Sequence, residues 1–185
     1  MKEYRSAIRS RELIREALCE MLKEKDVDKI TVADIVKTAR INRSTFYAHY
    51  QDMRALHEEI ENELLEEMYN LLNQYDYHGF FAEPYPIFLQ ICKFLEERKD
   101  NYKVMIGSSK TSEFLNKVKF LFEEYMVAAS NTPDSVRASK GFAARSCFFV
   151  GGIVSLFEKW LAGSLDMTAE ELAAELTGLI RNTPL

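Results

Sequence analysis

A short stretch near the front of the chain carries side chains that suit contact with a nucleic acid. It holds an arginine, three hydroxyl side chains, a histidine and an alanine: Arg43, Ser44, Thr45, Tyr47, Ala48 and His49. The planar guanidinium of Arg43 can pair with two acceptors of guanine in the major groove. Small side chains such as Ser44 and Ala48 let a helix lie deep in that groove. The stretch therefore predicts a DNA-reading surface if a helix presents it to solvent.

Apolar periodicity predicts three helices around this stretch. The first, from about Ser6 to Lys25, has a stripe with helical spacing: Ile14, Ala17, Leu18, Met21 and Leu22. Thr31 is a good cap for a second, short helix, in which Asp34 favourably faces the N-terminal dipole. A third helix is expected to begin at Arg43 or Ser44, with Phe46 and Tyr50 on its buried side. Two short helices joined by a tight turn describe a helix-turn-helix.

The segment Ile30 to Leu56, ITVADIVKTARINRSTFYAHYQDMRAL, resembles the DNA-binding domain of the TetR family of transcriptional regulators. The resemblance implies that the hydroxyls of Thr31, Thr45 and Tyr47 contact phosphates and that His49 contacts a phosphate or a base. Two positions depart from the family pattern. Arg40 stands where a glycine is usual, and Met53 stands where a lysine commonly faces the DNA backbone, with Arg54 beside it as a substitute cation.

The remainder of the chain is expected to be helical, which gives an all-α fold of about nine helices. We expect a DNA-binding domain over residues 1–56 and a C-terminal effector and dimerisation domain over residues 57–185. A long fourth helix from Met53 to about Leu71 should join them, because no proline or glycine linker intervenes. Further helices are expected at 84–95, 102–106, 111–130, 134–162 and about 169–181.

The last two predicted helices are similar to the pair that forms a four-helix dimer bundle in TetR-family proteins. On this basis the expected dimer-interface residues are Cys147, Gly151, Phe157, Leu172 and Leu176. The C-terminal section from Phe148 also resembles a subfamily that includes DhaS-type regulators, some of which act with a protein partner. The effector is therefore left open between a small molecule and a protein. Five aromatic residues either line a pocket for it or belong to the core: Tyr69, Tyr85, Phe88, Phe122 and Phe148.

Charge and composition narrow the function classes. The net charge of −5 divides into +3 for residues 1–54 and −8 for the rest, so the front segment is the one suited to a polyanion. Lys2, Arg5 and Arg9 form either a basic arm for the minor groove or a solvated face. No catalytic or metal-ligand spacing is visible, so we expect no enzyme, no metal and no cofactor.

Three scattered cysteines are interpreted as reduced core residues, and the absence of a signal peptide or membrane-length apolar run favours the cytoplasm. The leading hypothesis is a homodimeric regulator, more specifically a repressor, that binds a palindromic operator. The alternative is a helical protein-interaction adaptor or co-activator that has the helix-turn-helix shape without DNA affinity. A steep salt dependence of binding would separate the two.

Overall fold

The computed structural model describes residues 2–75, 82–106, 111–128 and 134–182, and every regular element within these ranges is helical. The α-helices are α1 (Lys2–Met21), α2 (Val32–Thr38), α3 (Arg43–Tyr47), α4 (Met53–Leu72), α6 (Pro84–Glu97), α7 (Lys99–Ile106), α8 (Thr111–Ala128), α9 (Asp134–Arg137), α10 (Phe142–Leu161) and α11 (Ala169–Asn182). A short 3-10 helix, Val27–Lys29, lies between α1 and α2. The expected all-α fold with a front and a rear domain is confirmed.

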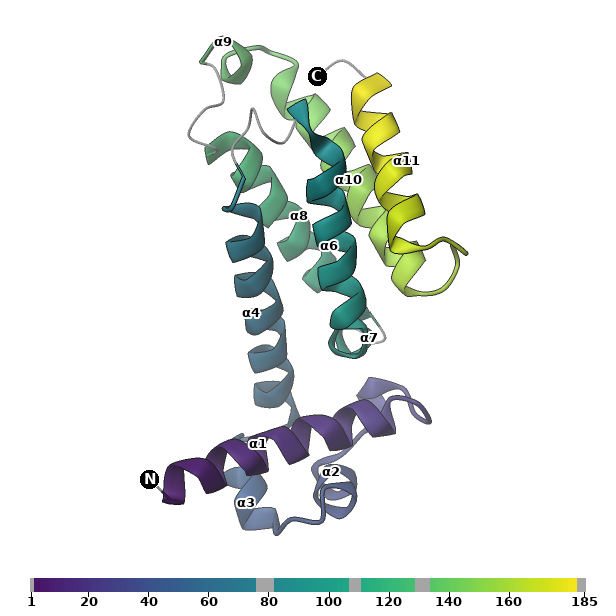
Figure 1. Ribbon diagram of the computed structural model, residues 1–185. Helices are drawn as coiled ribbons and strands as arrows, with labels where there is room; N and C mark the ends of the chain where they lie inside the picture. The colour runs from purple at the N-terminus through teal and green to yellow at the C-terminus, as the bar shows by residue number, and fades with distance from the viewer. Residues whose placement is uncertain (1, 76–81, 107–110, 129–133, 183–185) are drawn as a thin grey trace.

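The front part consists of α1, α2 and α3, and α1 crosses above the two short helices (Figure 1). The predicted stripe is buried at Ile14, Ala17 and Leu18. However, α1 begins about four residues before its predicted start and ends at Met21. Lys2, Arg5 and Arg9 therefore belong to a helix, and the choice between a minor-groove contact and a solvated face stays a prediction.

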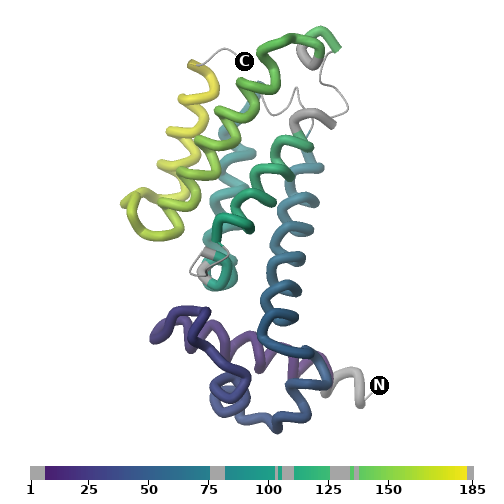
Figure 2. Tube along the Cα trace, turned by 180° about the vertical axis from the view of Figure 1, so that it is seen from behind, coloured from purple at the N-terminus to yellow at the C-terminus, as the bar shows by residue number. Residues whose placement is uncertain are grey.

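Helix α4 rises out of the front part and runs along the body (Figures 1 and 2). The Asp52 side chain caps it by accepting the backbone N–H of Ala55 at 2.8 Å. Apolar residues at spacings of three or four form its buried face, which is continuous along the helix: Leu56, Ile60, Leu64, Met68 and Leu71. One helix thus contributes side chains to the cores of both parts.

The body is built from two packed helix pairs, α6 with α11 and α8 with α10, and α7 lies at the end nearest the front part (Figure 1). Pro84 begins α6, where its missing N–H costs nothing. A capping box begins α11, because Thr168 Oγ1 accepts the Glu171 N–H at 3.2 Å and the Glu171 carboxylate accepts the Thr168 N–H at 2.8 Å.

The single helix predicted over 134–162 is wrong. A break at residues 138–141 separates α9 from α10, and Gly141 precedes the first turn of α10. Glycine has a low helix propensity, and the flanking Ser139 and Lys140 supply no apolar side chain to hold a helix there.

The interpretation of all three cysteines as core residues holds only for Cys92. Burial raises the pKa of its thiol to about 12, which makes it an inert core residue. Cys19 is half-buried and Cys147 is exposed. Helical periodicity could not identify the exposed side of α10, because that helix is apolar on nearly every face.

The aromatic residues suggested for one pocket do not meet in the structure. Phe88 and Phe122 are buried in the core, whereas Tyr69, Tyr85 and Phe148 are exposed on different helices. In the described part of the chain, no helix combines the length and the apolar character needed to cross a membrane.

Candidate nucleic-acid interface

Thr31 and Asp34 fix the start of α2. The Asp34 N–H donates to Thr31 Oγ1 at 3.3 Å, while the Thr31 N–H and hydroxyl both donate to Asp34 Oδ2, at 3.0 and 2.9 Å. Donation from the Thr31 backbone holds the pKa of the Asp34 carboxyl below its ordinary value, with help from the Thr31 hydroxyl and Lys25. The Thr31 side chain is exposed, but its hydroxyl proton already serves the cap.

The turn between α2 and α3 is a Schellman motif with an arginine in the glycine position. Arg40 has a φ of 53°, in the left-handed region. Its N–H donates to the Lys37 carbonyl at 3.3 Å, and the Ile41 N–H donates to the Val36 carbonyl at 3.2 Å. This pattern ends α2 and turns the chain sharply. Arg40 thus adopts the backbone conformation that the usual glycine would adopt at this position.

Helix α3 has one buried side and one exposed side. Phe46 is fully buried and Tyr50 nearly so, with ring centroids 5.7 Å apart. Tyr47 is 51% exposed. Its ring is nearly perpendicular to that of Phe46, and the two ring centroids are 5.6 Å apart. Four of the predicted contact residues are exposed, namely Arg43, Ser44, Tyr47 and Ala48, and Thr45 is half-buried beside them. The structure therefore brings these residues together on the outer face of α3 and the turn that follows it.

His49 differs from the other predicted contacts because its ring is directed toward α1. Its Nε2 lies 2.7 Å from Ser10 Oγ, and the Ser10 hydroxyl can also donate to the Ala7 carbonyl. The donor in the His49–Ser10 hydrogen bond depends on the tautomer of the ring. The residue ties the end of the recognition segment to α1, and only Nδ1 remains for a contact with DNA.

Unpaired cations gather around the turn. In the described ranges, Lys37, Arg40 and Arg43 take part in no ion pair, and all three side chains are exposed. By contrast, Arg54 Nε lies 3.0 Å from Glu58 Oε1, so the cation beside Met53 is neutralised within the chain. Sequence reasoning overlooked Lys37, although its three-residue spacing from Arg40 was a usable signal.

Three contacts attach the recognition segment and α1 to α4. The Tyr50 hydroxyl donates to Glu59 Oε1 at 2.6 Å, and Arg11 forms an ion pair with the same carboxylate at 3.5 Å. Arg15 binds Glu63 one turn further along α4. Burial, together with the Glu59 carboxylate, raises the pKa of the Tyr50 hydroxyl, which keeps it protonated as a donor. Movement of α4 would therefore carry the whole helix-turn-helix with it.

Comparison with protein families identifies the chain. Residues 14–60 match the family model described as bacterial regulatory proteins, tetR family, and residues 82–182 match the model described as transcriptional regulator C-terminal region. Together the two models cover most of the sequence. The chain belongs to the TetR family. It is accordingly a DNA-binding transcriptional regulator and not an enzyme.

Solved structures of TetR-family regulators share the fold. The dihydroxyacetone kinase operon activator DhaS is 20% identical with a TM-score of 0.62, over 94% of this chain and 95% of that one. NalD, the secondary repressor of the MexAB-OprM efflux pump in Pseudomonas aeruginosa, is 16% identical with a TM-score of 0.66, over 96% of each chain. A TetR regulator from Streptococcus agalactiae is 22% identical with a TM-score of 0.64, over 97% and 98%. A comparison with curated proteins finds no significant match.

The residues expected at the dimer interface of this TetR-family protein divide into two groups. Cys147 is exposed and Gly151 half-buried on α10. Phe157, Leu172 and Leu176 are instead buried within their own chain, at 6%, 1% and 1% exposure. Leu172 and Leu176 lie on α11, which packs against α6, and Phe157 lies beside Met68, Leu95 and Phe114. The single chain therefore leaves little of their surface for a second subunit.

The outer surface of α10 presents small side chains around one large aromatic ring. Phe148 is 73% exposed, and a Cβ added to Gly151 or Gly152 would meet nothing within 4 Å. On α11, Leu179 is exposed and an added Cβ at Gly178 would also find open space. We call Cys147, Phe148, Gly151, Gly152, Gly178 and Leu179 the α10/α11 face.

Proposed function

We propose that this regulator is a cytoplasmic homodimeric repressor that binds a palindromic operator and responds to an effector. The observation that carries the proposal is the exposed side of α3, held in place by buried Phe46 and Tyr50 and flanked by unpaired cations. A DNA-reading domain over residues 1–56 and a dimerisation and effector domain over residues 57–185 suit this role.

The side chains divide by chemistry into base-reading and phosphate-binding groups. Arg43, at the start of α3, reads a guanine through two hydrogen bonds, and Ser44 and Ala48 permit close approach to the groove floor. Thr45 and Tyr47 donate their hydroxyl protons to phosphates, and Thr31 does so once its hydroxyl turns away from Asp34. His49 adds a contact with a phosphate or a base through Nδ1. Lys37 and Arg40 supply further phosphate contacts, because their charges are not neutralised within the chain.

Two copies of the domain are needed, because one copy reads too few base pairs for useful specificity. Twofold symmetry would place two α3 helices about 34 to 36 Å apart, one turn of DNA. The α10/α11 face is the surface proposed for this pairing. Small residues there let helices approach closely, and Phe148 provides apolar area that is exposed in the single chain.

Repression is proposed because the simplest outcome of occupying an operator is to exclude other proteins from it. One of the similar structures is titled a repressor and another an activator. The structural similarity therefore favours neither repression nor activation. An effector that prefers the wrong separation of the two α3 helices would weaken operator binding by its difference in affinity for the two states.

Selection of binding sites from random DNA duplexes tests this function. The proposal predicts enrichment of an inverted repeat whose half-site centres are about one helical turn apart. Recovery of single, unrepeated half-sites would contradict the dimer, and no enrichment at low ionic strength would contradict operator binding.

A helical adaptor or co-activator is the second candidate. It is favoured by the neutralisation of Arg54 by Glu58, which leaves the Met53 position without a compensating cation, and by the net charge of −5. An adaptor would bind DNA without a steep dependence on salt, or not at all.

A further inference from the structure

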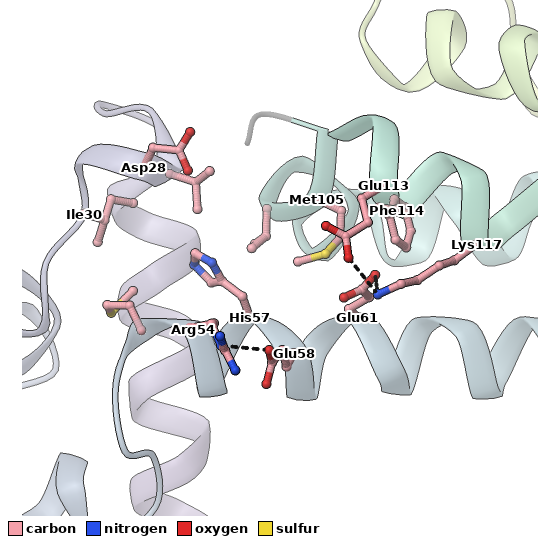
Figure 3. Close-up of a pocket in the computed structure, with 13 residues that line it drawn as sticks. Asp28, Ile30, Arg54, His57, Glu58, Glu61, Met105, Glu113, Phe114 and Lys117 are labelled. Atoms are coloured by element: carbon pink, nitrogen blue, oxygen red, sulfur yellow. Dashed lines mark ion pairs between the residues drawn. The ribbon is translucent and has the colours of Figure 1, made fainter. Parts of the chain in front are cut away.

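A cavity of about 330 Å³ lies where the helix-turn-helix part meets the body (Figure 3). Its wall comes from three segments: the connection Val27–Ile30, the first turns of α4, and helices α7 and α8. The volume is at the lower end of the range for small-molecule sites. We call it the junction cavity.

Two other spaces in the described part of the body suit a small organic ligand less well. The cavity among Met68, Leu95, Tyr102, Phe114 and Phe157 has a volume of about 30 Å³, room for little more than one water molecule. A groove beside Tyr69 and Phe120 is larger but lies open on the surface of α4 and α8. The junction cavity is thus better suited than either to enclose an organic molecule.

The lining of the junction cavity combines apolar and acidic groups. Val27, Ile30, Met53, Met105 and Phe114 provide apolar surface. On α4 and α8 the charged side chains of the lining are Glu58, Glu61 and Glu113 against Arg54 and Lys117, so carboxylates exceed cations by one on these two helices. This imbalance favours a ligand with positive charge.

Lys117 lies between two of the carboxylates that line the cavity. Its Nζ lies 2.8 Å from Glu61 Oε1 and 3.7 Å from Glu113 Oε1, so one ammonium serves two carboxylates. The Glu61 side chain is only 14% exposed, which makes its charge poorly screened by water. Figure 3 shows this trio on one side of the cavity and the balanced pair of Arg54 and Glu58 nearby on α4.

We propose that the junction cavity binds a small organic cation with an apolar body, and that this ligand changes the position of the helix-turn-helix relative to the body. The proposal rests on the proposed function and places the effector site at the junction between the two parts. A ligand there touches the α1–α2 connection and α8 at once, so any difference in their separation alters its affinity. Couplings of this kind change the affinity of the second ligand by about 5- to 150-fold.

Fluorescence titration of the full-length protein with two dyes tests the binding. Thioflavin T carries one positive charge on an aromatic body, and anilinonaphthalene sulfonate is an anion of comparable size. The cation should bind at least tenfold more tightly than the anion. Equal affinity, or preference for the anion, would overturn the proposal whether or not the protein binds DNA.

Two substitutions in the cavity should move the affinity for thioflavin T in opposite directions. Glu61→Gln removes a carboxylate and should weaken binding about three- to tenfold, whereas Lys117→Met removes the competing ammonium and should strengthen it by a similar factor. General damage to the fold would weaken both. The control Glu175→Gln, at an exposed position on α11, should have no effect. Weaker binding by both cavity variants, or no change in either, would overturn the proposed chemistry.

The second part of the proposal, that the ligand alters the position of the helix-turn-helix, is tested by measuring affinity for the selected operator with and without saturating thioflavin T. The proposal predicts that saturating dye changes the operator affinity at least fivefold. In Glu61→Gln the same change in operator affinity should require a higher dye concentration. An unchanged operator affinity would overturn regulation through the junction. Failure of the protein to bind any duplex would contradict the proposed function, while the dye titrations would still decide the ligand class.

Discussion

The conformation of one residue, Arg40, helps to set the direction in which α3 leaves the turn. Arg40 adopts a conformation that glycine would adopt without steric cost, and both hydrogen bonds of the Schellman motif form around it. For a residue with a Cβ, the left-handed conformation costs roughly 1 to 2 kcal/mol. The chain tolerates this cost at the point where an additional cation faces the proposed DNA side.

Arg40→Gly should therefore stabilise the protein. The relief of strain exceeds the extra chain entropy of glycine, and the free energy of unfolding should rise by about 0.5 to 1 kcal/mol. Urea denaturation measures it. The matched control Lys37→Gly, inside α2, should destabilise by about 1 kcal/mol. Destabilisation by both would mean that the Arg40 side chain makes a stabilising contact.

Arg43 and Tyr47 should differ in how they affect DNA binding. Arg43→Ala should cost roughly 1 to 3 kcal/mol on the selected operator and relax the preference at one base pair. Tyr47→Phe removes a phosphate contact and should weaken operator and competitor DNA alike. Footprints and titrations on both DNAs measure this. Identical behaviour of the two variants would contradict the assigned roles.

The exposed residues of α3 could be anticipated from sequence because Phe46 and Tyr50 define the buried side by their spacing. The direction of His49 could not, since its partner Ser10 lies 39 positions away. The neutralisation of Arg54 follows the local i, i+4 rule and was available from the sequence.

For individual helices, the buried side could be predicted from sequence where apolar residues form a single stripe. It could not be predicted where apolar residues cover several sides. α4 has apolar residues on one side, and its buried face matches the sequence pattern. α11 buries Leu172, Leu176 and Ile180, but its apolar Leu179 is exposed. α10 is apolar almost all round, so its pattern could not separate Phe157, which is buried, from Phe148, which is exposed. Only packing against α6 and α8 makes that distinction.

Phe148→Ala should weaken dimerisation without destabilising the protomer, because the ring is exposed in the single chain. Sedimentation velocity should show a larger monomer fraction, with a loss of roughly 1 to 3 kcal/mol of association free energy. Phe120→Ala, which removes an exposed ring from α8, is the control and should leave the dimer intact. A dimer unaffected by Phe148→Ala and by Gly151→Leu would place the interface elsewhere.

The capping box of α2 should make the stability of the front part depend on pH. The pKa of Asp34 is lower in the folded chain than in the unfolded one, so its contribution is present above the unfolded value and lost as pH falls through the folded value. Asp34→Asn should therefore destabilise the protein at neutral pH, and the difference from the parent should vanish once the pH falls below the lowered pKa of the folded chain. Thermal melts across this range measure it, and a difference that is constant with pH would contradict the assignment.

For the whole molecule, the distribution of charge favours an approach to DNA through the front part. A front part with net charge +3 is attached to a rear part with −8, and the unpaired cations surround the α2–α3 turn at the far end from α11 (Figure 1). The acidic body is kept away from a polyanion that the front part can approach. The sequence predicted this division from its charge counts, whereas the junction cavity depends on long-range packing that no local pattern indicates.

The salt dependence of affinity for the selected operator tests the central claim most directly. If Lys37 and Arg40 of two subunits each neutralise a phosphate, the logarithm of the association constant should fall against the logarithm of salt concentration with a slope of about −4 or steeper. Lys37→Ala should make that slope shallower by about 2. A slope near zero, or a slope that Lys37→Ala leaves unchanged, would contradict the proposal that the α2–α3 surface binds DNA.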